Sequence, residues 1–155
     1  MSNNQGFTLI EVLIAVVVLA VGLLGLAGLQ TTSLKHNQTA YFRSQATQMA
    51  YDMADRIRAN HDEAKLGGAS TYVVGNATAH AGCSTLVGCT ATEMAENDLF
   101  EWIATLQAAL PGVNAVGTVT YNAALSLFSI QVQWDDNRDN NIDDADPSFQ
   151  TDFQL

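Results

Sequence analysis

The sequence contains few basic residues. Its 155 residues include 6 lysines and arginines against 16 aspartates and glutamates, which gives a net charge of −10. A surface that binds DNA or RNA neutralises phosphates with positive side chains. The composition therefore excludes nucleic acid as a partner, and the length fits a single domain.

The sequence also lacks the motifs of common enzymes. It contains no H-E-x-x-H, no G-x-S-x-G, no P-loop and no glycine-rich dinucleotide pattern. The histidines, His36, His61 and His80, are scattered along the chain. We therefore predict that the protein is not an enzyme.

The charged residues are distributed unevenly. Residues 1–65 contain five acidic and five basic residues, so this part is neutral. Residues 66–155 contain the other 11 acidic residues and a single basic residue, Arg138. The chain therefore has two chemically different parts, and the second carries the whole net charge.

An uncharged apolar stretch runs from Val12 to Leu29. Its 18 residues are long enough, at 1.5 Å per residue, to be a candidate membrane span. From Phe42 to Ile57 apolar residues then recur every three or four positions, and no proline precedes Pro111. The pattern predicts one helix from about Phe7 to Asn60, with an apolar first half and one apolar stripe in its second half.

The rest of the chain predicts short elements. Residues 61–92 have the composition of turns and loops, and a helix is expected over 93–110 with Thr92 as its N-cap. A strand is expected at 116–121 because that stretch is rich in β-forming residues. Strands are also expected at 128–134 and 149–155, because apolar and polar residues alternate there. We therefore predict an α+β fold in which the long N-terminal helix packs on a small antiparallel sheet.

Glu11 is a carboxylate inside the apolar stretch. A charge at the centre of a membrane helix costs about 3 kcal/mol, and less near the end of the helix. One interpretation is an acidic residue favoured by the dipole at the start of a helix. The other is a functional carboxylate that needs a positive partner, such as the amino group of a chain cleaved before Phe7.

The residues Gly6-Phe7-Thr8-Leu9-Ile10-Glu11 closely resemble the N-terminal motif of type IV pilins and pseudopilins. The stretch from Gly22 to Asn60 resembles the minor pilins of this family, and the resemblance continues more weakly to the C-terminus. It implies a pilin-like fold, cleavage between Gly6 and Phe7 by a prepilin peptidase, and N-methylation of Phe7. It also implies that Glu11 is the assembly carboxylate, which pairs with the amine of an adjacent subunit.

The same resemblance divides the chain into three parts. Residues 1–6 are expected to be a leader and residues 7–60 the helix, with 7–29 as its membrane and fibre-core segment. Residues 61–155 are expected to form a globular periplasmic head with a disulfide loop. The implied location is the inner membrane and then the pilus at the cell surface. The implied partners are membrane lipid, the pilus assembly platform, the major pilin and other minor pilins.

Three functions are compatible with these features. The favoured one is a minor pilin that enters type IV pili and helps to initiate or modify them. The alternatives are a pseudopilin of a type II secretion system and a membrane-anchored calcium-binding or adhesive module that does not polymerise.

Cys83 and Cys89 are the only cysteines, and they lie in a loop rich in small residues. No further cysteine is present to complete a thiolate zinc site, and the spacing differs from C-x-x-C. A disulfide fits an exported domain, and two free thiols are the alternative. Many major pilins have their disulfide near the C-terminus, so this position favours a minor pilin.

The densest acidic cluster lies at residues 135–146. Six side-chain oxygens follow the spacing of a calcium loop, which requires many oxygen ligands around a tight turn. Asn140 stands where such loops have a glycine. The cluster is therefore either a calcium site or a solvated acidic turn, and no other cofactor is expected. The candidate ligands are Asp135, Asn137, Asp139, Asn141, Asp143 and Asp146.

Overall fold

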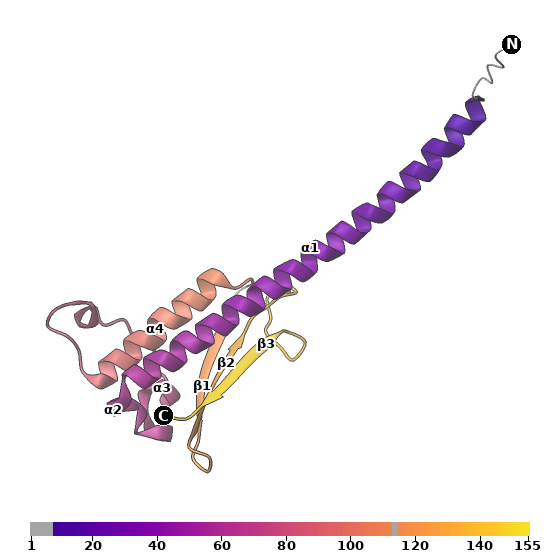
Figure 1. Cartoon of the computed structure of the whole chain (residues 1–155). Coiled ribbons are helices and arrows are strands. Elements are labelled where there is room, and N and C mark those ends of the chain that lie inside the picture. Colours follow the sequence, from indigo (N-terminus) through magenta and orange to yellow (C-terminus); the bar gives the residue numbers. More distant parts are fainter. Residues whose placement is uncertain (1–7, 113–114) are drawn as a thin grey trace. The chain divides into compact units, whose positions relative to one another are not determined.

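The computed structural model describes residues 8–112 and 115–155 (Figure 1). It divides into two compact units, residues 1–40 and 41–155, each of which is described by itself. The elements are α1 (Leu9–Ala59), α2 (His61–Ala64), η1 (Gly67–Ala69), α3 (Thr71–Val74), η2 (Ala81–Ser84), α4 (Ala91–Ala109), β1 (Val116–Asn122), β2 (Leu127–Gln133) and β3 (Ser148–Phe153).

The first unit consists of the N-terminal part of α1. Phe7, the predicted first residue of the helix, lies outside the described residues, and α1 begins at Leu9. Every residue from Leu9 to Asn37 is exposed. By length and composition alone, α1 includes a segment apolar enough to cross a membrane, and none of that segment is buried.

The second unit begins within α1, where the apolar stripe expected from the sequence is buried. The buried residues recur at helical spacing because they share one face of the helix. They join side chains of α4 and of the sheet in a single hydrophobic core. The buried residues of α1 are Ala46, Met49, Ala50, Met53, Ala54 and Ile57.

The sheet is antiparallel with the strand order β1-β2-β3. Val119 pairs with Ile130, and Phe128 pairs with Phe153. The apolar residues that alternate along β2, Phe128, Ile130 and Val132, are all buried. This arrangement confirms the predicted fold class, a pilin-like α+β fold with a long N-terminal helix and an antiparallel sheet.

The start of α4 corrects one prediction. Thr92 was expected to cap this helix, but Thr90 is the N-cap. The Thr90 hydroxyl accepts the N–H of Glu93 at 3.2 Å, and the Glu93 carboxylate accepts the N–H of Thr90 at 2.8 Å. This reciprocal arrangement requires a glutamate three residues after the cap, which only Thr90 has.

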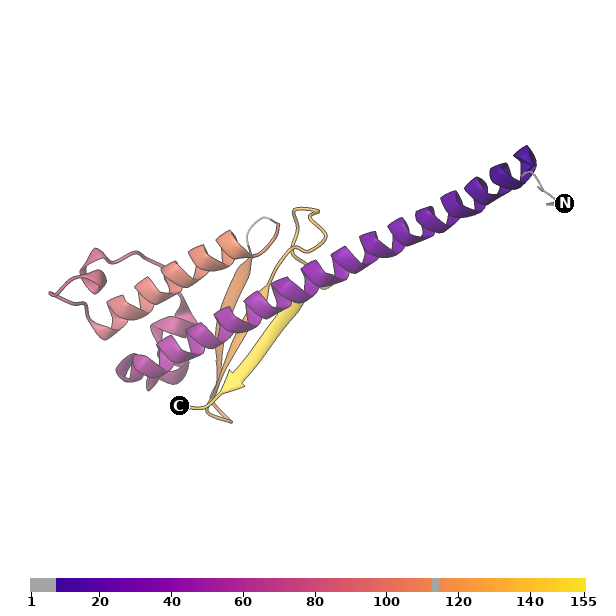
Figure 2. The same cartoon turned by 45° about the horizontal axis from the view of Figure 1, so that its top comes forward.

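The short apolar run at residues 71–74 forms a helix, α3, although it was grouped with loops in the prediction. Ser70 caps it by accepting the N–H of Tyr72. The Tyr72 ring is buried in the core. A longer loop then leads to α4, and Figure 2 shows that this loop extends beyond the N-terminal end of α4.

Candidate functional site

The motif residues Gly6 and Phe7 lie outside the described residues. Glu11 lies in the first turn of α1, where its carboxylate accepts a hydrogen bond of 3.5 Å from the Thr8 hydroxyl. Among the described residues, no ion pair includes Glu11. This carboxylate is therefore available to a cation supplied from elsewhere.

The helix surface that follows Glu11 is almost entirely apolar. Leu24 is 73% exposed and Leu29 is 69% exposed, and Lys35 is the next charged residue in the sequence. An apolar surface of this extent is stable in lipid or against other apolar helices, and it is unfavourable in water. Glu11 is thus the single charge in a segment that requires an apolar environment.

A network of charged residues lies at the C-terminal part of α1. The Arg56 guanidinium pairs with Asp52 at 2.9 Å, with Asp98 at 3.0 Å and with Glu101 at 3.1 Å. Burial alone would lower the pKa of Arg56, but hydrogen bonds to the three carboxylates raise it above its ordinary value. Hydrogen bonds from Arg56 and then Asn97 hold the pKa of Glu101 below its ordinary value.

Tyr72 extends this network into the core. Its hydroxyl donates a 2.6 Å hydrogen bond to Asp98, and burial together with this bond raises the pKa of Tyr72. The Asn60 side-chain amide donates to the Tyr72 hydroxyl at 3.3 Å and to the Ala91 carbonyl at 2.7 Å. The network therefore holds together the end of α1, α3 and the start of α4.

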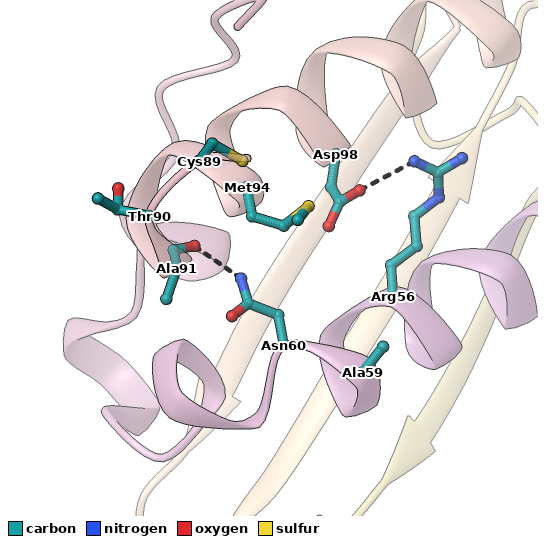
Figure 3. A pocket seen from close by; sticks show the side chains of 8 residues that line it. All are labelled: Arg56, Ala59, Asn60, Cys89, Thr90, Ala91, Met94 and Asp98. Carbon is teal, nitrogen blue, oxygen red and sulfur yellow. Dashed lines mark hydrogen bonds and ion pairs between the residues drawn. The ribbon is translucent and has the colours of Figure 1, made fainter. Parts of the chain in front are cut away.

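A cavity of about 330 Å³ lies beside this network (Figure 3). Both oxygens of Asp98 are already hydrogen-bonded, one to Arg56 and the other to Tyr72. A carboxylate held in this way is not placed to act as a general base, so the cavity has the character of a binding surface rather than an active site. It is lined by Arg56, Ala59, Asn60, Cys89, Thr90, Ala91, Met94 and Asp98.

Cys83 and Cys89 form a disulfide, which confirms the predicted pairing. Further bonds attach the preceding part of the loop to α4. The Thr78 N–H donates to the Glu96 carbonyl at 3.1 Å, and the His80 N–H donates to the Asn97 side chain at 2.9 Å. The His80 ring lies 2.6 Å from the Glu96 carboxylate.

Asp135 closes the acidic loop. Its side chain is fully buried, and one oxygen accepts the N–H groups of Arg138 and Asp139 at 2.6 and 3.2 Å. The other oxygen accepts the N–H of Asn140 at 3.1 Å. Asn140 has a φ of 68°, the left-handed conformation that its position in a calcium loop requires.

Asp146, another of the six predicted calcium ligands, accepts the N–H of Asp143. Among residues 8–112 and 115–155, no group of three or more histidine, cysteine, aspartate or glutamate side chains is placed to hold a metal ion. The backbone makes a suitable turn, and its amides donate to the carboxylates of Asp135 and Asp146. Calcium binding stays a prediction, which titration calorimetry of the full-length protein with calcium tests directly.

Sequence reasoning missed the network of Arg56 and Tyr72. Asp98 lies 42 positions after Arg56 and 26 after Tyr72. Local periodicity carries no information on pairs so far apart. One feature of the sequence did indicate such a network. The predicted helices contain acidic residues, and the chain has few basic residues to pair with them.

Two known protein families match adjoining parts of the chain. Residues 1–27 match the family described as the prokaryotic N-terminal methylation motif, and residues 28–100 match the family described as type IV pilin Tt1218. No curated protein and no solved structure shows a match to the chain. The matched region includes the motif around Glu11, all of α1 and the disulfide loop.

Proposed function

We propose that this chain is a type IV pilin, because residues 28–100 match the family described as type IV pilin Tt1218 and residues 1–27 match the N-terminal methylation motif. Within this family, we propose that it is a minor pilin that enters type IV pili and helps to initiate or modify them. Pilins are structural proteins, and this one is not an enzyme. The methylation motif implies processing by a prepilin peptidase and assembly with other pilins.

The observation that carries this proposal is the exposed apolar segment of α1 with Glu11 at its start. Lipid covers such a segment before assembly, and the helices of neighbouring subunits cover it in a fibre. A carboxylate transferred into that environment must be paired. The amine at Phe7 of an adjacent subunit, released by cleavage after Gly6, would supply the positive charge.

The minor role is supported by the position of the disulfide. Cys83–Cys89 closes a loop before α4, whereas many major pilins have a disulfide near the C-terminus. The stretch from Gly22 to Asn60 resembles the type IV pilus modification minor pilin PilV. The family comparison gives the broader pilin description, so PilV itself receives no support from it.

We further propose that the head faces the periplasm while α1 is in the inner membrane, and that the subunit then moves to the pilus. Its partners in that path would be the assembly platform, the major pilin and other minor pilins. The large negative charge of residues 66–155 favours solubility of an exported head.

Substitution of Glu11 tests this function. In the native bacterium, Glu11→Ala and Glu11→Gln should each lower the amount of this subunit in sheared pili. The decrease should be at least about tenfold, because each variant loses one ion pair. Asp55→Ala, which changes an exposed carboxylate of α1, should leave it unchanged. A membrane-anchored module that does not polymerise would be absent from the pili of the unaltered strain.

Deletion of the gene separates a pilin from a secretion pseudopilin. A minor pilin predicts loss of surface pili and of twitching motility, with protein secretion intact. Loss of secretion with normal pili would overturn the proposal and would establish the pseudopilin alternative.

A further inference from the structure

The tip of the disulfide loop exposes two neighbouring aliphatic side chains. Leu86 is fully exposed and Val87 is 92% exposed. Other exposed aliphatic residues of the second unit keep much more of their surface covered, for example Leu125 at 58% and Val74 at 67%. An adjacent pair of fully exposed aliphatic residues is unfavourable in water unless another surface covers it.

The loop holds this tip in a defined position. The Cys83–Cys89 disulfide closes it, and the bonds from Thr78 and His80 to α4 anchor the preceding residues. A tip that is already ordered loses little conformational entropy when it binds. The loop therefore has the properties of a preorganised contact surface.

The sequence around the tip contains no acidic or basic residue. From Leu66 to Thr92 there is no aspartate, glutamate, lysine or arginine, so all 11 acidic residues of the range 66–155 lie from Glu93 onward. Two such heads repel each other through most of their surface, because both are strongly negative. The uncharged segment is where two copies can approach without this repulsion.

The cavity described above lies directly beside the loop. Cys89 and Thr90, which follow the tip in the chain, form part of its wall, and Ala59, Ala91 and Met94 form apolar parts of the rest. Figure 3 shows Met94 and Cys89 on the same side of this cavity. An apolar projection and a cavity whose wall is apolar at Ala59, Ala91 and Met94 lie on one surface, which makes that surface complementary to a copy of itself.

We propose that two copies of this chain associate through this surface, with Leu86 and Val87 of each copy entering the cavity of the other. The contact is reciprocal, as in a two-fold symmetric dimer. This symmetry is compatible with two subunits in one membrane. Their heads lie on the same side when the two-fold axis is perpendicular to the membrane. The inference does not rest on a role in the fibre.

Photocrosslinking of the full-length protein in detergent micelles tests this contact. The protein carries p-benzoylphenylalanine in place of Leu86, and unlabelled copies are mixed with nitrogen-15-labelled copies. We expect a crosslinked dimer in which mass spectrometry joins the loop of one isotopic copy to Ala59 or Met94 of the other. The same photoreactive residue in place of Leu125, in the turn between β1 and β2, is the matched control.

Filling the cavity provides a second measurement. Ala59 is exposed at the cavity wall, so Ala59→Trp blocks the cavity without changing the core. It should lower the crosslink yield by at least about tenfold. Ala104→Trp, on an exposed part of α4 outside the cavity, should leave the yield unchanged.

Three results would overturn the proposal: equal dimer yields from positions 86 and 125, crosslinks that map outside the cavity, or no effect of Ala59→Trp. Circular dichroism verifies that the variants are folded. Because the measurement uses purified protein without other pilins, its failure would leave the proposed minor-pilin function unaffected.

Discussion

The indole N–H of Trp102 donates a 2.9 Å hydrogen bond to the backbone carbonyl of Met49 and thereby joins α4 to α1. On its other side the Trp102 ring packs against β1 so closely that a Cβ on Gly117 would overlap it. One buried side chain therefore sets the distance between two helices and the sheet. The core depends on the size of this ring as well as on its donor.

Gly117→Ala should destabilise the protein. The added methyl group has no space beside Trp102, and overpacking of this kind costs about 2 kcal/mol. Urea unfolding of the protein in detergent, followed by tryptophan fluorescence, measures the loss. Gly68→Ala is the control, because its Cβ would lie 3.8 Å from the nearest atom of Tyr121. Equal stability of the two variants would contradict the packing argument.

A comparison of the two tryptophans separates the contribution of the indole hydrogen bond to stability from that of the packed ring. Trp134 is as deeply buried as Trp102, but its indole N–H has no hydrogen-bond partner in the part of the chain that the structure describes. Trp102→Phe should therefore lower the free energy of unfolding by about 1 kcal/mol more than Trp134→Phe. Chemical denaturation of both variants gives this difference, and a larger loss in Trp134→Phe would refute the assignment.

Glu63 should make stability depend on pH. Burial raises its pKa, but hydrogen bonds from Thr71 and Thr92 outweigh burial and hold the pKa below the ordinary 4.5. The stabilisation is therefore fully present above pH 4.5 and is lost as the pH falls through the lower pKa of the folded state.

The variant Glu63→Gln measures this contribution. It should be less stable than the wild type at neutral pH, and the difference should shrink below pH 4.5. Denaturation across this range is the measurement, and Asp55→Asn, at an exposed position, is the control. A difference that does not change with pH would show that the carboxylate charge is not responsible.

Asp135 should stabilise the acidic loop through its hydrogen bonds to the backbone. Asp135→Ala removes the acceptor of three backbone N–H groups, and the loss should be about 3 kcal/mol. Asp144→Ala, at an exposed position of the same loop, should change stability little. A chelator that leaves the unfolding temperature unchanged would favour the solvated acidic turn. A chelator that lowers the unfolding temperature would instead indicate a structural metal.

Much of the fold followed from local patterns. The stripe from Ala46 to Ile57 and the alternation along β2 predicted a helix and a strand, because each depends only on residues a few positions apart. The cap of α4 was misplaced by two residues, although the capping box with Glu93 was present in the sequence. α3 was missed because a single helical turn is too short to show periodicity.

The sequence by itself determined the apolar segment, the carboxylate at Glu11 and the uncharged loop, since each is a property of neighbouring residues. Only the tertiary structure decided that Arg56 meets Asp98 and that the cavity forms beside the disulfide loop. Both arise where α1 and α4 pack together. These residues are distant in the sequence and meet only in the folded chain, so local conformational preferences could not predict their contact.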